Sequence, residues 1–142
     1  RDGAIVACGA RTGGYVLFIA DDRPVFAYNA IGDFTRIAGA PLAGGEVVLE
    51  VRFVKTDEHV GDLTLLIDGE VAAQTVLRML PWRQTLYGMD IGRDLGSTVV
   101  ADYVAPFAYG GRLHYVDYRL EDDRDDLRAA AAVEARNALV DQ

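Results

Sequence analysis

The sequence of 142 residues has few of the side chains that disulfide-rich and zinc-binding proteins need. Cys8 is the only cysteine, so no disulfide can form within the chain. A lone cysteine in an apolar strand usually behaves as a small buried hydrophobe, and nothing indicates a secreted disulfide scaffold. Zinc sites need clusters of cysteine and histidine, which are also absent from the sequence.

Side chains for nucleophilic catalysis are equally scarce. Ser97 is the only serine, and His59 and His114 are the only histidines. A catalytic triad needs a nucleophile, a histidine and an orienting acid within reach of one another, and no nucleophile-elbow motif surrounds Ser97. We expect His59 to lie in a surface loop and His114 to lie in a strand, neither of them with a catalytic role.

The sequence also has few basic residues and no long apolar run. The chain has 14 Lys and Arg against 22 Asp and Glu, a net charge of −8. This balance disfavours nucleic acid and anionic membranes, because both attract Lys and Arg. No run approaches the roughly 18 apolar residues of a membrane helix. The first residues show neither a start methionine nor a signal-peptide pattern, so we expect a piece of a longer protein.

The strongest structural signal that is present is a pair of β-compatible runs joined by Asp68-Gly69, within residues 62–75. Asp-Gly between apolar runs is typical of a tight hairpin, because a type I′ turn needs positive φ at both central residues. Glycine adopts such angles freely and aspartate tolerates them. The segment therefore predicts antiparallel β structure. Further strands are expected at residues 3–10, 15–20, 25–29, 34–38, 46–54, 89–91 and 113–120.

Two of these strands carry information about the core. Residues 15–20 are apolar on both faces, which predicts a central strand covered on both sides. Residues 46–54 alternate strictly between apolar and polar side chains, which predicts one buried and one solvated face. We expect the apolar face of this strand to be a main contributor to the core. That face consists of Val47, Leu49, Val51 and Phe53.

The periodicity changes after residue 121. Alanine is dense over residues 122–142, and Leu127, Ala131, Ala135 and Leu139 recur at four-residue spacing. This pattern predicts a helix with a narrow apolar stripe, which must dock on the sandwich, on a second copy or on another domain. The sequence therefore predicts an antiparallel β-sandwich over residues 1–121, followed by a C-terminal α-helix over residues 122–142.

Residues 92–111 lack clear periodicity, and a loop of this length is often functional or packed over a sheet. Asp90 and Asp94 stand four residues apart in a glycine-rich segment, which makes them weak candidates for calcium ligands. The spacing of an EF-hand is missing and Arg93 adjoins Asp94. We therefore favour turn capping, or an ion pair with Arg93, over a metal site.

Several aromatic residues lie outside the confident strands, and exposed rings on loops are able to stack on sugars. They are Trp82, Tyr87, Tyr103, Phe107 and Tyr109. Trp82 and Tyr103 are the candidate platform of a carbohydrate-binding module. The alternative is that these rings close the open ends of a sandwich, and we favour this alternative. An enzyme of the glucanase type is least favoured, because Arg52 stands where a second acid would accompany Glu50.

Three segments together resemble one known family. Residues 5–18 read IVACGARTGGYVLF, residues 21–29 read DDRPVFAYN, and residues 91–99 read IGRDLGSTV, followed by Asp102-Tyr103, Pro106-Phe107 and Gly111. This combination resembles the C-terminal domain of a subgroup of bacterial arylsulfatases. Ala10, Asp22 and Thr98 depart from the family pattern, and these departures affect turns more than the fold.

The resemblance implies a concanavalin-like, or laminin-G-like, β-sandwich appended to a sulfatase. It implies a non-catalytic accessory domain that packs on the catalytic domain of the same parent chain. Arg93, Asp94, Trp82 and Tyr103 are then the candidates for ligand or domain contacts. The carbohydrate-binding, lectin-like module stays open as the alternative function.

The resemblance also implies that this chain does not itself carry the residues of the sulfatase reaction. The catalytic motif of the family, Cys- or Ser-x-Pro-x-Arg, and its divalent metal, calcium, are expected in the parent's catalytic domain. Cys8 lacks the proline and the spacing of that motif, so we expect no cofactor and no catalytic residue in this chain. A homo-oligomer through the C-terminal helix is a further expectation, and the compartment stays open between cytoplasm and periplasm.

Overall fold

The structure is a computed structural model, and it describes residues 1–80 and 88–120. Within these residues the chain forms antiparallel β-strands and no helix. The strands are β1 (Gly3–Ala10), β2 (Gly13–Ala20), β3 (Arg23–Ala30), β4 (Asp33–Ala38), β5 (Leu49–Asp57), β6 (Val60–Ile67), β7 (Glu70–Arg78) and β8 (Met89–Ile91). The all-β prediction is confirmed for this part, and the helix expected over residues 122–142 lies outside the described residues.

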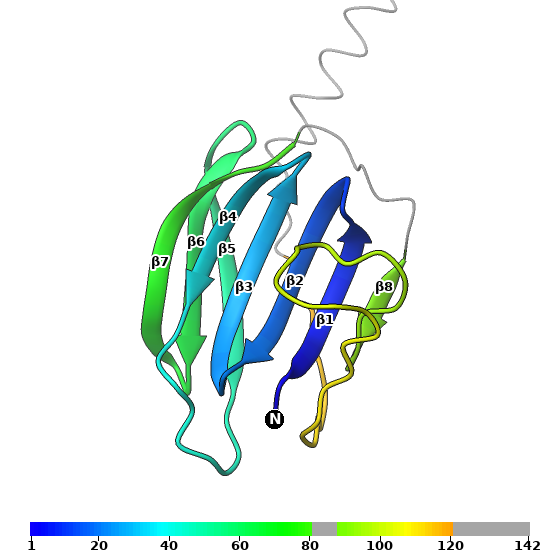
Figure 1. The fold of residues 1–142 in the computed structure, drawn as a ribbon. Coiled ribbons are helices and arrows are strands. Elements are labelled where there is room, and N and C mark those ends of the chain that lie inside the picture. The colour runs from blue at the N-terminus through cyan, green and yellow to red at the C-terminus, as the bar shows by residue number, and fades with distance from the viewer. Residues whose placement is uncertain (81–87, 121–142) are drawn as a thin grey trace, which may run out of the picture.

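The strands form two sheets. One contains five strands in the order β4-β3-β2-β1-β8, and the other contains three in the order β5-β6-β7. Figure 1 shows the two sheets face to face, with β7 beside β4. Strands β1 to β4 and β5 to β7 each pair with their sequence neighbours, whereas β8 returns to pair with β1. The molecule is therefore a β-sandwich of two antiparallel sheets.

The predicted Asp-Gly hairpin is confirmed between β6 and β7. Asp68 and Gly69 have φ angles of 50° and 81°, the left-handed values that a type I′ turn requires. The Asp68 carboxylate also accepts a hydrogen bond from the backbone N–H of Val48 at 2.8 Å, and the Asp68 N–H donates to the Val48 carbonyl at 2.8 Å. The turn is thus tied to the segment that enters β5.

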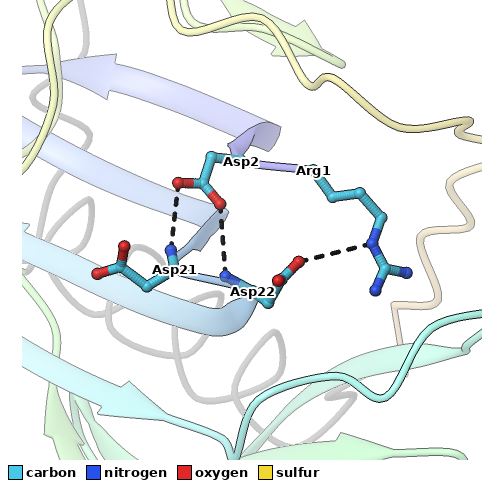
Figure 2. Close-up of polar contacts among 4 residues, drawn as sticks. All are labelled: Arg1, Asp2, Asp21 and Asp22. Carbon is cyan, nitrogen blue, oxygen red and sulfur yellow. Dashed lines mark hydrogen bonds and ion pairs between the residues drawn. The ribbon is translucent and has the colours of Figure 1, made fainter.

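A second tight turn joins β2 and β3 without any glycine. Asp21 and Asp22 have φ angles of 51° and 59°. Figure 2 shows that the carboxylate of Asp2 accepts hydrogen bonds from both of their backbone N–H groups, at 3.2 and 3.4 Å. The Arg1 guanidinium lies 3.6 Å from the Asp22 carboxylate. The start of the chain therefore supports this turn.

Strand β2 is the centre of the larger sheet, and the prediction that both of its faces are covered is confirmed. Val16 and Phe18 are buried on one face, and Ile19 is buried on the other. On the Ile19 side, the core between the sheets joins side chains of β3 and β4 to side chains of β6 and β7. These are Phe26, Tyr28 and Ile37 from the larger sheet and Leu63, Leu65 and Leu77 from the smaller one.

Strand β5 differs from its prediction. It begins at Leu49 rather than residue 46 and runs to Asp57. The alternation is present, since Leu49 and Val51 are half-buried, but Phe53 is 37% exposed and no residue of the strand is fully buried. The expectation that this strand is a main contributor to the core is therefore wrong. The reason is its position at an edge of the smaller sheet, whose central strand β6 supplies Leu63 and Leu65 instead.

The strand expected over residues 113–120 is also wrong, because residues 112–120 form no strand pairing. The edge of β1 that faces away from β2 pairs with β8 instead. Leu113 and Val116 instead pack against the cluster of Ile5, Val6 and Ile19. His114 is accordingly not in a strand. It is half-exposed, with Nε2 3.3 Å from a carboxylate oxygen of Glu46.

Candidate functional site

The loop that follows β8 forms a second covering layer on the larger sheet. Figure 1 shows this segment, coloured yellow-green to yellow, crossing over β1 and β2 on the side away from the smaller sheet. Its Val99, Val100 and Tyr103 are buried against the sheet. The sheet side chains beneath them are small or flat enough to admit a close layer. They are Ala4, Ala7, Val16, Phe18, Val25 and Ala27.

Three aromatic rings anchor this layer. Tyr103 and Phe107 are stacked, with centroids 4.5 Å apart and planes 17° apart, and both rings lie against Phe18 of β2, at 5.3 and 6.3 Å. Tyr103 is only 9% exposed. A tyrosine packed between two other rings presents no free face to a sugar. Its geometry therefore fits the prediction that the loop aromatics close the sandwich better than it fits a carbohydrate platform.

Arg36 on β4 covers the same aromatic cluster from outside. Its guanidinium carbon lies 5.8 Å from the centroid of the Phe18 ring, a cation–π arrangement. It also forms an ion pair with Asp102 of the loop. One arginine thus links the edge of the larger sheet to the loop through both a ring and a carboxylate.

Asp94 is a buried acid at the start of the loop, only 2% exposed. The Tyr103 hydroxyl donates a hydrogen bond to Asp94 Oδ2 at 2.5 Å. Burial raises the pKa of the Asp94 carboxyl, against the opposing effect of hydrogen bonds from Tyr103 and the Val99 backbone. Burial, together with the bond to Asp94, also raises the pKa of Tyr103, so this phenol stays protonated and donates at neutral pH. The pair fastens one end of the loop to its middle.

Asn29, at the end of β3, is fully buried and joins three segments. Its Nδ2 donates to the carbonyls of Arg11 and Val99, at 2.8 and 2.9 Å, and its Oδ1 accepts from the N–H of Gly32 at 2.8 Å. The β1–β2 turn, the β3–β4 turn and the loop therefore converge on one amide. Asn29 is not among the residues predicted for the site, although an amide after the apolar residues of β3 was the available signal.

The remaining predicted site residues are not brought together. Asp90 Oδ2 accepts a hydrogen bond from the N–H of Leu95 at 2.8 Å, as a turn-capping carboxylate does. Arg93 is exposed and forms no ion pair with any residue that the structure describes. Residues 1–80 and 88–120 contain no group of three or more His, Cys, Asp and Glu able to hold a metal ion. Trp82 and Tyr87 lie outside the described residues.

The candidate nucleophiles and histidines are also dispersed. Ser97 Oγ accepts a long hydrogen bond, 3.4 Å, from the Arg11 backbone N–H. Cys8 is half-buried in β1. His59 lies in the β5–β6 turn beside Glu58, as its loop position predicts. In the described part of the chain, no hydrogen bond or ion pair joins Ser97 or Cys8 to either histidine, so no triad is assembled there.

The fold and this loop define a class: a two-sheet antiparallel β-sandwich whose larger sheet is covered by an irregular, well-anchored loop. Comparisons with protein-family models, with curated proteins and with solved structures found no match to this chain. In the described residues, no helix has the length and apolar character needed to span a membrane. Function is therefore inferred from the residues themselves.

Proposed function

We propose that this chain is a non-catalytic accessory domain of a bacterial arylsulfatase-like protein, with a concanavalin-like sandwich fold. In this role it packs on the catalytic domain and completes or shields it. The observation that supports the proposal most is the role of the motif residues in the loop. Asp94 bonds to Tyr103, the Val99 carbonyl accepts from Asn29, and Phe107 packs on Phe18. In a non-catalytic domain the motif residues are expected to stabilise the packing, and these residues do so.

The glycines of the first motif, residues 5–18, also allow close packing. Gly9 and Gly14 face each other across β1 and β2, with φ angles of 114° and 141°. A Cβ at Gly9 would lie 2.2 Å from the Gly13 carbonyl oxygen, and one at Gly14 would lie 2.0 Å from the Cys8 carbonyl oxygen. No side chain fits at either position. These glycines therefore serve a close approach of the two backbones at the end of the β1–β2 hairpin, not a reactive group.

Strand β8 and the loop that follows it also offer a surface for a partner domain. Ile91, Leu95 and Val104 are apolar yet exposed, Val104 by 84%. Apolar side chains held outward by a well-packed layer suit an interface between domains. In the parent protein, the catalytic domain would supply the formylglycine nucleophile and the calcium ion.

The test uses the full-length parent and measures aryl sulfate hydrolysis together with thermal unfolding. Val104→Asp should lower the activity or the unfolding temperature of the parent while leaving the isolated sandwich folded. Val54→Asp is the matched control, because Val54 is 53% exposed on the smaller sheet. It should leave the parent unchanged.

Deletion of this domain should lower the stability or the activity of the parent, and the isolated chain should not hydrolyse an aryl sulfate. A parent whose stability and activity survive both the deletion and Val104→Asp would contradict the proposed role. A parent without any sulfatase motif would contradict it as well.

A further inference from the structure

An open hollow of about 250 Å³ lies between the β1–β2 turn and the covering loop. The contacts that anchor the loop do not depend on this hollow. It is lined by Arg11, Gly96, Ser97, Thr98, Tyr103, Val104 and Ala105. The lining residues thus include one arginine, three hydroxyl-bearing residues and a turn containing glycine.

The turn at residues 96–98 provides hydrogen-bond donors. Gly96 has a φ of 87°, and open space surrounds the position where its Cβ would be. The backbone N–H groups of residues 96–98 form no hydrogen bond with the described part of the chain. Successive N–H groups beside a left-handed residue are the usual backbone component of anion-binding concavities.

Thr98 adds a hydroxyl that is almost enclosed. The residue is only 7% exposed, and its hydroxyl has no hydrogen-bond partner among the described residues. No side-chain oxygen or nitrogen in the described residues is both fully buried and without a partner. The Thr98 hydroxyl therefore reaches solvent, and Thr98 is one of the residues that line the hollow. The hydroxyl of Ser97, which accepts only the long bond from Arg11, stands beside it.

The charge balance at the hollow favours an anion, although the chain as a whole carries −8. Arg11 is exposed and forms no ion pair with any described residue. The acids of the neighbouring loop are already engaged, because Asp94 is buried beneath Tyr103 and Asp102 is paired with Arg36. Arg11 thus supplies a positive charge that neither of these two acids neutralises.

We propose that this hollow is a binding site for an oxyanion group, a sulfate, phosphate or carboxylate. Arg11 supplies the charge, and the N–H and hydroxyl groups of residues 96–98 supply the donors. Charge-assisted hydrogen bonds of this kind are the strong ones in proteins. The volume exceeds that of a single ion, and Val104 and Ala105 form an apolar wall, so the group belongs to a small organic molecule. The proposal does not rest on the accessory-domain function.

The test is an NMR titration of the isotope-labelled chain with inorganic sulfate, inorganic phosphate and acetate in turn, with ionic strength held constant by sodium chloride. Saturable shifts of the Gly96, Ser97 and Thr98 amide signals are expected for at least one anion. The anion that shifts them at the lowest concentration identifies the tetrahedral or the planar group. Absence of saturation by about 50 mM for all three anions would overturn the proposal.

Arg11→Gln should weaken the binding by about tenfold or more, because it removes the charge from a charge-assisted contact. Arg112→Gln is the matched control, an exposed arginine with no ion pair among the described residues, and it should bind as the unchanged chain does. Ser97→Ala should weaken binding by a few-fold through the loss of one donor. Unchanged binding in both Arg11→Gln and Ser97→Ala would overturn the assignment to this hollow, even if some anion binds elsewhere.

Discussion

The two faces of the five-stranded sheet are covered in different ways. On one face, the smaller sheet supplies a regular layer of apolar side chains, among them Leu63 and Leu65. On the other face, an irregular loop achieves comparable burial, with Val99 and Val100 nearly inaccessible. The regular layer satisfies its backbone within its own strand ladder. The loop has no such ladder, and it is held by the Asn29 amide, the Asp94–Tyr103 bond and a few backbone hydrogen bonds.

This difference shows where specific residues matter. A sheet layer depends on the apolar pattern, which many sequences satisfy. A loop layer depends on particular buried polar contacts. If one partner of such a contact is removed, the buried donor or acceptor that remains is unsatisfied and costs its full desolvation free energy. The buried polar contacts of this molecule accordingly gather in the loop layer, at Asn29 and at the Asp94–Tyr103 pair.

The largest expected effect is a loss of folding stability, tested by comparing one core residue from each side of the five-stranded sheet. Phe18→Ala and Leu65→Ala should each lower the free energy of unfolding by roughly 2–5 kcal/mol, because both side chains are fully buried. Hydrogen exchange distinguishes them. Phe18→Ala should speed exchange at residues 99–107 far more than Leu65→Ala does, because it removes the ring that Tyr103 and Phe107 contact. Equal exchange in that loop for both variants would mean that the two layers open as one.

The next effect concerns the buried acid of the loop. The pKa of Asp94 is raised above its ordinary value of 3.8 by burial. Between the two values the folded chain binds more protons than the unfolded chain, so this group lowers the free energy of unfolding as pH rises through that window. Asp94→Asn cannot ionise. Its stability relative to the unchanged chain should therefore increase with pH from about 3.8 and level off above the folded pKa.

Urea denaturation over a pH series measures this difference directly. Asp33→Asn, at an exposed position in β4, is the control for replacing an aspartate by asparagine. A difference for Asp94→Asn that stays constant or decreases with pH would show that the carboxyl is not destabilised by its burial.

The smallest effect compares two half-exposed arginines. Arg36 links β4 to the loop through Phe18 and Asp102, whereas Arg52 pairs, among the described residues, with Glu50 on its own strand. Arg36→Gln should cost about 1 kcal/mol, and Arg52→Gln should cost a few tenths, because surface ion pairs within one element contribute little. Thermal unfolding of both variants checks the order. A larger loss for Arg52→Gln would remove Arg36 from the loop anchors.

Much of the strand order in sequence was predictable, for local reasons. The Asp68-Gly69 turn and the apolar segment of β2 depend on φ preferences and on side-chain alternation, which neighbouring residues determine. The predicted contribution of β5 to the core and the predicted strand at residues 113–120 were wrong for a shared reason. Alternation shows that a segment suits a sheet, but it does not show whether the strand is central, at an edge or without a partner.

The candidate site was predictable only as a segment. The loop of residues 92–111 was singled out because it lacks periodicity, and Asp94 and Tyr103 were both named. Their bond to each other, and the role of Asn29 between Arg11 and Val99, were not foreseen. Contacts between residues far apart in the chain leave no periodic trace, and a buried polar side chain in one strand does not reveal its partner.

The sequence by itself determined the local conformations: tight turns at residues that accept positive φ, extended strands where apolar side chains alternate, and close backbone approach at glycine. The tertiary structure alone decided that β8 pairs with β1, and that the following loop becomes a layer of the core. The physical reason is that burial depends on which surfaces meet. That outcome follows from the packing of the whole chain, and no segment specifies it alone.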